Sequence, residues 1–149
     1  MPYSLVRFKM EHLKDFDNRP EQEADLNYFL KDETTQRIWL RVLPIFTFMY
    51  KDKPIMIFGM QNSGIGTYYP MLFAAKAVDK HRFAMIRCIY DYVEKFVSTD
   101  VRRFEAHVSA TDEQANRLVQ FFGFEAVGYR RQAGAGGEDQ VIYERLWRK

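Results

Sequence analysis

Two ionisable residues two positions apart are the most direct candidates for proton-transfer chemistry in this sequence. Apolar and polar residues alternate from position 103 to 109, which predicts a half-buried strand. Glu105 and His107 then share the polar face of that strand. A histidine beside a carboxylate can serve as a general base. A solvent-exposed strand face carries the same pair without any function, and this simpler interpretation is favoured.

The other reactive side chains form no recognisable site. His12 and His81 have no cysteine or carboxylate at metal-ligand spacing, so no metal site is predicted. Cys88 is the single cysteine, which excludes an intrachain disulfide, and no base is identifiable to activate its thiol. The segment Gly64-Ile65-Gly66 joins two predicted strands and precedes no helix, so it indicates a hairpin turn rather than a phosphate-binding loop.

Length and composition point to one folded domain, expected to cover residues 1–149. Hydrophobic residues make up 47% and charged residues 28%, which excludes a wholly disordered chain. The 22 Lys and Arg against 20 Asp and Glu leave a net charge of +2, and there is no nucleic-acid-binding motif. The most apolar stretch, 43–60, is interrupted by three charged residues, which argues against a membrane-spanning helix. The N-terminal segment has no apolar signal-peptide core. We expect a soluble protein, cytoplasmic or virion-associated and not secreted.

Hydrophobic periodicity predicts the elements that hold these residues. Strands are expected near 4–10, 45–50, 54–60, 67–75, 103–109, 124–131 and 140–147. Helices are expected over 21–41 in one or two pieces, over 79–97, and from Thr111 to about Phe122 with a stop at Gly123.

Three local features refine these elements. In the helix 79–97 a stripe is expected to face the core; it comprises Phe83, Ile86, Tyr90, Val93 and Val97. Asp79 and Thr111 are the expected N-caps of their helices. Pro70 predicts a bulge or an unpaired edge inside its strand, because proline has no N–H to donate.

This order of elements, with the segment from Asp112 to Tyr143, resembles the GCN5-related N-acetyltransferase (GNAT) superfamily. The last helix of that family commonly reads Asn-x-x-Ala-x-x-apolar-Tyr-x-x-x-Gly-Phe, and residues 112–124 have the same spacing. The resemblance implies an α/β (α+β) fold, with a mixed, mostly antiparallel central sheet of about six to seven strands and helices on both faces. It also places Glu105 and His107 beside the family's cleft and implies acetyl-CoA as cofactor if the protein is active.

The sequence departs from that family at two positions that carry chemistry. The family's cofactor loop reads Gln/Arg-x-x-Gly-x-Gly/Ala, and its glycines let backbone N–H groups approach a pyrophosphate. The matching stretch 76–83 contains no glycine, and Asp79 in it would repel phosphates. The resemblance leaves it five weak cofactor-binding candidates: Lys76, Ala77, Val78, Lys80 and Arg82. Val119 occupies the position of the family's general-acid tyrosine, and its side chain cannot donate a proton.

These departures favour a non-catalytic interaction protein on an acetyltransferase scaffold, with no cofactor. The pattern is most similar to the acetyltransferase-like internal virion proteins of short-tailed phages, which implies a protein partner in a virion assembly or as an accessory component. The alternative is an active acetyl-CoA-dependent N-acetyltransferase with an atypical cofactor loop. Acetyl-CoA binding distinguishes the two hypotheses.

Overall fold

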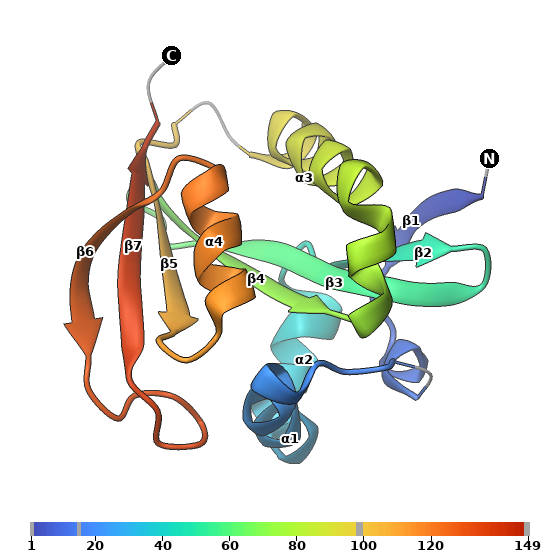
Figure 1. Cartoon of the computed structure of the whole chain (residues 1–149). Helices are drawn as coiled ribbons and strands as arrows, with labels where there is room; N and C mark the ends of the chain where they lie inside the picture. Colours follow the sequence, from blue (N-terminus) through green and yellow to red (C-terminus); the bar gives the residue numbers. More distant parts are fainter. Residues whose placement is uncertain (1, 15, 98–99, 148–149) are drawn as a thin grey trace.

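A seven-stranded sheet runs through the protein in the computed structural model, which describes residues 2–14, 16–97 and 100–147 (Figure 1). The strands are β1 (Tyr3–Arg7), β2 (Phe46–Tyr50), β3 (Lys53–Asn62), β4 (Thr67–Ala74), β5 (Arg103–Ser109), β6 (Glu125–Arg130) and β7 (Gln140–Leu146). Their order in the sheet is β1-β2-β3-β4-β5-β7-β6. Among the strands that the structure describes, β4 and β5 are the one parallel pair. The expected mixed, mostly antiparallel sheet is confirmed.

Within the described residues, four α-helices and three short 3-10 helices accompany the sheet. They are α1 (Glu23–Lys31), α2 (Glu33–Arg41), α3 (Arg82–Phe96), α4 (Glu113–Phe121), η1 (Met10–Leu13), η2 (Pro20–Gln22) and η3 (Lys76–His81). The region 21–41 is helical in two pieces because Asp32 ends α1 and caps α2, where its carboxylate accepts from the backbone of Thr34 and Thr35. None of the described helices has the length and apolar character needed to cross a membrane.

Helices cover both faces of the sheet, and alternate residues of β3 show this directly. Ile57 is fully buried in a cluster with Phe29 of α1 and Trp39 of α2. Its neighbour Met56 is buried against α3 on the other face, in a cluster with Tyr92. On the same face as α3, α4 packs over β5 and β7 (Figure 1).

The core-facing side of α3 is only partly the predicted stripe. Ile86 and Val93 pack against the buried cluster as expected, and Val97 packs against a neighbouring one. Met85 and Tyr92 are buried, whereas Phe83 is 92% exposed and Tyr90 47% exposed. Both sets of residues recur at helical spacing, so periodicity alone cannot choose between them. The choice is made by tertiary contacts, among them the Tyr92 hydroxyl, which donates to the carbonyl oxygen of Pro44 at 3.0 Å.

Both predicted N-caps are wrong. Residues 76–81 form η3 instead of helical turns of α3, and Asp79 pairs with Arg82 at 3.4 Å. Asp112 caps α4 in place of Thr111, because its carboxylate accepts from the backbone N–H of Ala115 at 3.1 Å. The stop at Gly123 is confirmed, and its φ of +87° is a conformation that favours glycine.

Two strand expectations need correction. The strand β1 ends at Arg7, since the Phe8 N–H donates to the Ile45 carbonyl at 3.0 Å and Met10 already begins η1. Pro70 causes no bulge, because the β3–β4 register continues through it. Its strand edge is unpaired as expected: β4 and β5 pair at Thr67–Arg103 and Tyr68–Phe104, and Pro70 lies beyond both pairs.

Candidate functional site

The gap between β4 and β5 is the centre of the candidate site. After their two paired positions these parallel strands diverge, and a cavity opens on each face of the sheet at the gap. Both cavities are lined by Asp25, Pro70, Leu72, Phe73 and His107, so they meet between the two strands. We name them the α4-side cavity and the α2-side cavity.

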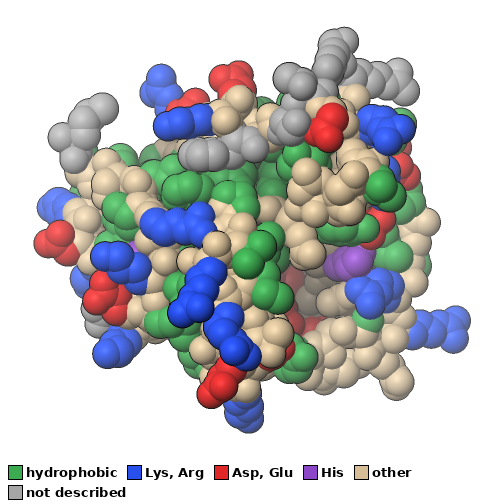
Figure 2. All heavy atoms as spheres, turned by 180° about the vertical axis from the view of Figure 1, so that it is seen from behind, with side chains coloured by type: hydrophobic (Ala, Val, Ile, Leu, Met, Phe, Trp, Pro, Cys, Tyr) green, Lys and Arg blue, Asp and Glu red, His purple; other side chains and the backbone are tan. Residues whose placement is uncertain are grey.

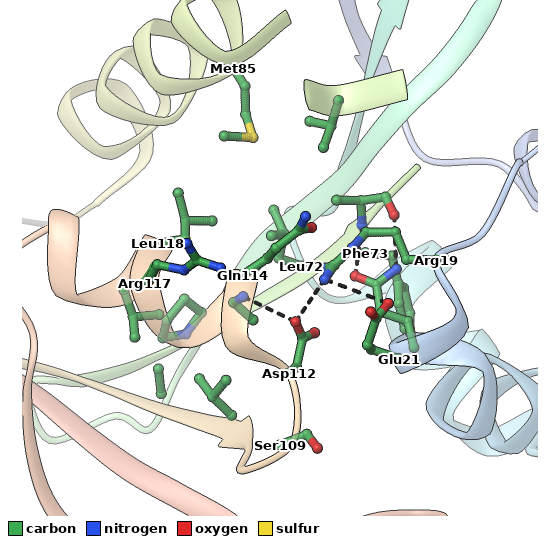
Figure 3. Close-up of a pocket in the computed structure, with 18 of the residues that line it drawn as sticks. Arg19, Glu21, Leu72, Phe73, Met85, Ser109, Asp112, Gln114, Arg117 and Leu118 are labelled. Atoms are coloured by element: carbon green, nitrogen blue, oxygen red, sulfur yellow. Dashed lines mark hydrogen bonds and ion pairs between the residues drawn. The ribbon is translucent and has the colours of Figure 1, made fainter. Parts of the chain in front are cut away.

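The α4-side cavity has a volume of about 520 Å³ and lies between β4, β5, α3 and α4 (Figure 3). Apolar side chains supply much of its wall, including Leu72, Met85 and Leu118. Polar side chains enter it from η2 and from the start of α4, and Figure 3 shows Arg19 and Asp112 pointing toward each other there.

A buried ion pair spans this cavity. The Arg19 guanidinium donates to the Asp112 carboxylate at 2.7 Å, and the two side chains are 9% and 6% exposed. Glu21 lies 3.7 Å from the same guanidinium nitrogen, and Asp112 also caps α4. The pair therefore ties η2 to the first turn of α4 across the gap between β4 and β5.

A buried glutamine occupies the free edge of β4. The N–H of Ala75 donates to β3 at Ile55, so the polar groups of Ala74 point the opposite way, toward the gap. There the Ala74 N–H donates to Gln22 Oε1 at 3.0 Å, and Gln22 Nε2 donates to the Ala74 carbonyl at 2.9 Å. One side-chain amide thus replaces the peptide group of a neighbouring strand.

The residues before Gln22 extend this pairing along the chain. Asn18 forms an antiparallel bridge with Ala75, and the Lys76 N–H donates to the Asp17 carbonyl at 2.9 Å. We call residues 17–22 the N-terminal strap. The strap lies against the end of β4 and carries both Arg19 and Gln22 into the α4-side cavity.

The predicted cofactor-binding residues lie between β4 and α3, and they face different surroundings. Val78 is buried and lines the α4-side cavity, while Ala77 packs beside the α3 cluster. Lys76 pairs with Asp17 at 3.7 Å, Arg82 pairs with Asp79, and Lys80 is exposed. The structure thus brings Val78 and Arg82 to the cavity but not Lys76, Ala77 or Lys80.

Val119 lines the α4-side cavity from α4 and packs in the cluster that includes Ala106 and Val108. A tyrosine hydroxyl does bond to this helix: Tyr143 donates to Asn116 Oδ1 at 2.5 Å. Gln120 Nε2 donates to the same hydroxyl at 3.4 Å. This tyrosine is buried and does not line the cavity, so it does not substitute for the missing general acid there.

The α2-side cavity, of about 510 Å³, opens on the opposite face of the sheet. Figure 2 shows this face hollowed beside a histidine side chain. Aromatic residues form one wall, namely Trp39, Tyr69 and Phe73. Carboxylates contribute from two elements, Asp25 on α1 and Glu105 on β5. Burial raises the pKa of Asp25, and the nearby Glu138 carboxylate raises it further.

His107 has both ring nitrogens engaged at the edge of this cavity. Arg130 can only donate, and its Nη1 lies 2.9 Å from His107 Nδ1, so Nδ1 holds the lone pair. The proton is then on Nε2, which donates to Glu105 at 2.7 Å. Burial opposes ionisation of Glu105, yet hydrogen bonds from His107 and Arg103 leave its pKa lowered. His107 therefore has no free ring lone pair, and each carboxylate oxygen of Glu105 already accepts one hydrogen bond.

Further titratable groups add no catalytic constellation. Burial raises the pKa of the Cys88 thiol to about 12, and the charge of Asp91 adds to this, so the thiol is unreactive at neutral pH. Across the described residues, no three His, Cys, Asp or Glu side chains are placed to hold a metal ion. The glycines of Gly64-Ile65-Gly66 lie in the β3–β4 turn at positive φ, which confirms the predicted hairpin.

Sequence reasoning missed the two residues that fill the α4-side cavity. Arg19 and Gln22 lie in a predicted break around Pro20, where polar residues are ordinary. Their partners are 93 and 52 positions away along the chain. A periodic pattern cannot encode such contacts. The one available signal is Asp112, which stands where the resembling family has asparagine.

Comparison of the structure with solved proteins shows the fold. Ard1 from Thermoplasma volcanium superimposes with a TM-score of 0.73 at 10% identity, over 100% of both chains. A GNAT-family acetyltransferase from Bacillus anthracis gives 0.65 at 14% identity, over 98% of this chain and 95% of that one. An N-acetyltransferase from Staphylococcus aureus Mu50 gives 0.61 at 18% identity, over 98% and 99%.

Comparison of the amino-acid sequence alone finds no relative. No family model matches it, and no curated protein matches it significantly. The chain therefore has the GNAT acetyltransferase fold, and it carries that fold with a sequence far from the solved structures it resembles.

Proposed function

We propose that this protein uses the acetyltransferase fold, as one domain over residues 1–149, to bind another protein and does not transfer acetyl groups. The observation that carries the proposal is the N-terminal strap on the free edge of β4. The sequence resemblance to internal virion proteins of short-tailed phages suggests that the partner belongs to a virion or a similar assembly. The fold alone implies acetyl-CoA only for an active protein.

Acetyl-CoA does not fit the residues present. A cofactor that paired with the edge of β4 would need the N–H and carbonyl of Ala74, and Gln22 uses both. Displacing the strap would also separate Arg19 from Asp112 and leave the Asp112 carboxylate without its cation. Asp79, in η3 just before α3, would hold a carboxylate near the phosphates of a bound cofactor and repel them. The chain's own side chains thus compete with the cofactor for the cleft.

The residues available for proton transfer argue in the same direction. Both ring nitrogens of His107 are engaged, one by Arg130 and the other by Glu105, so the ring is not turned toward a substrate. Glu105 is a weakened base, because its pKa is lowered. Val119 cannot protonate a departing thiolate, and Tyr143 is held away from the cavity.

Calorimetry with acetyl-CoA at low salt tests the cofactor part of the proposal. We expect weak or absent binding by the wild type, and a Kd near or below about 1 μM, or roughly −8 kcal/mol, would refute it. Gln22→Met is the informative variant, since it frees the Ala74 edge with little change in volume. Binding by this variant alone would show that the strap blocks an otherwise competent cleft. Glu23→Ala, an exposed change at the start of α1 directly after the strap, is the matched control.

Thiol release from acetyl-CoA, measured with a mixed pool of amines, peptides and aminoglycosides, tests catalysis. We expect no turnover by the wild type or by Val119→Tyr. Turnover by the wild type would establish an enzyme. Turnover by the variant alone would show an intact cofactor cleft that lacks only its acid, since well-placed acid catalysis contributes about 10²–10⁴-fold.

One observation favours the alternative, an active N-acetyltransferase with an atypical cofactor loop. The two cavities meet at the gap between β4 and β5, which would let a cofactor on one face reach an acceptor on the other. Under this alternative the strap moves aside when acetyl-CoA binds. Tight binding together with turnover by the wild type would select it.

A further inference from the structure

The outward face of α3 is apolar at two positions where water-exposed helices are usually polar. Phe83 is 92% exposed and Tyr90 47% exposed, and the two residues lie one heptad apart on α3. The exposed Phe121 at the end of α4 lies on the same side of the sheet, and the Tyr90 ring contacts Phe122 at 5.4 Å. Exposed aromatic residues grouped in this way mark a contact surface.

Two charged residues of opposite sign lie on the same face of α3. Positions 83, 87, 90 and 94 follow one another at spacings of four, three and four, which is one side of a helix. Arg87 lies in the first half of α3, and Glu94 lies in the second half, one heptad later. Both are exposed, and neither has an ion-pair partner among the described residues. The face is therefore positive toward its beginning and negative toward its end.

A second copy of the same helix, laid antiparallel, complements this pattern. A two-fold axis crossing α3 near Tyr90 brings Arg87 of each copy to Glu94 of the other, so both charges are paired twice. The Tyr90 rings meet near the axis, and the Phe83 rings cover the two outer ends. The antiparallel arrangement also opposes the two helix dipoles favourably. A parallel copy would instead place like charges side by side.

We propose that this α3 face, formed by Phe83, Arg87, Tyr90 and Glu94, is the two-fold interface of a homodimer. A two-fold interface uses the same patch on both copies, which is what a helix with opposite charges at its two ends provides. The interface is separate from the gap between β4 and β5. It does not depend on whether acetyl-CoA binds.

Charge exchange between two variants gives a sharp test by sedimentation velocity. The wild type is expected to dimerise with a Kd between about 1 and 300 μM. Arg87→Glu makes the face uniformly negative, and Glu94→Arg makes it uniformly positive. Each variant alone is expected to raise the dimer Kd by about tenfold or more. An equimolar mixture of the two variants should form a heterodimer at the wild-type concentration, because every pair is then opposite in sign.

Controls separate this interface from folding effects and from other surfaces. Arg37→Glu makes the same charge change on the exposed side of α2 and should leave the dimer intact. Phe83→Ser should weaken association without lowering the melting temperature, since the ring contributes almost nothing to the core. A wild type that stays monomeric over the whole range overturns the proposal. So does persistence of either single charge variant as a dimer, or failure of the mixture to associate.

Discussion

The two cavities at the gap between β4 and β5 have similar volumes but different contents. The α4-side cavity is spanned by a buried ion pair and by a glutamine amide that hydrogen-bonds to β4. The α2-side cavity is lined by aromatic rings and by polar groups that stay partly exposed, such as Glu105 and His107 at 20% and 28%. One side is closed by the chain's own polar groups, and the other stays open to solvent.

This difference shows how a fold can retain its cleft while the chain's own side chains occupy the positions that a cofactor would use. Diverging parallel strands leave backbone N–H and carbonyl groups without partners, and such groups must be satisfied by something. Gln22 satisfies the Ala74 edge from within the chain, whereas a cofactor would do so from outside. If the side chains in the α4-side cavity stabilise the fold and those in the α2-side cavity do not, substitutions in the two cavities should lower the unfolding free energy by different amounts.

The largest effect is expected from Arg19→Met. This change removes the cation and leaves the Asp112 carboxylate buried with no ion-pair partner. Breaking a buried pair in this way typically costs about 3–5 kcal/mol of unfolding free energy. Urea unfolding followed by circular dichroism measures the loss.

A double variant isolates the charge in that measurement. Asp112→Asn keeps an oxygen that can cap α4 but removes the negative charge. Arg19→Met combined with Asp112→Asn should therefore be more stable than Arg19→Met alone. If the single variant costs less than about 1 kcal/mol, the pair behaves like an exposed one and the contrast between the cavities fails.

The next effect in size is expected from Gln22→Met. The methionine side chain has nearly the same length but cannot hydrogen-bond, so the Ala74 N–H and carbonyl lose their partner while they remain buried. Unsatisfied buried groups of this kind cost about 1–3 kcal/mol. The unfolding free energy should decrease while the m-value stays unchanged, because the surface buried on folding stays the same. An unchanged stability would mean that water replaces the amide and that the β4 edge is open.

Much of the fold could be predicted from the sequence, but the contents of the cleft could not. The alternation of residues 103–109 and the Gly123 stop are local features, and the structure confirms the strand and the helix end that they predict. The predicted inward face of α3 was right at Ile86 and Val93 but wrong at Phe83 and Tyr90, because two apolar stripes compete and only tertiary contacts select between them. Arg19 and Gln22 act through partners far along the chain, and no repeating pattern records a single long-range hydrogen bond.

Smaller effects are expected on the α2 side, where His107→Gln serves as the example. The imidazole joins Glu105 and Arg130, but these groups are in contact with solvent, and Arg103 continues to pair with Glu105 at 2.9 Å. Pairs of this kind contribute about 0.2–1 kcal/mol, so the loss in unfolding free energy should stay below about 1 kcal/mol. A loss comparable to that of Arg19→Met would show that the two sides are equally structural.

The smallest effect concerns Asp25, which lines both cavities and tests whether they differ in polarity where they meet. Burial raises the pKa of its carboxyl in the folded protein, and Glu138 raises it further, against a hydrogen bond from the backbone of Ala135. The folded state then binds a proton more tightly than the unfolded state. This contribution to stability is fully present below the unfolded pKa of about 3.9 and is lost as pH rises through the folded pKa.

Asp25→Asn removes the titration and keeps an oxygen that can accept from Ala135. The variant should match the wild type at low pH and become more stable as pH rises toward neutrality. Its advantage should stay below about 1 kcal/mol, because the carboxyl is only half-buried and solvent screens its charge. Unfolding free energies of the two proteins across this pH range give the comparison, with Asp52→Asn in the exposed β2–β3 turn as the matched control. An advantage that is largest in acid would reverse the sign and show that the Asp25 carboxylate is stabilised, not penalised, where the two cavities meet.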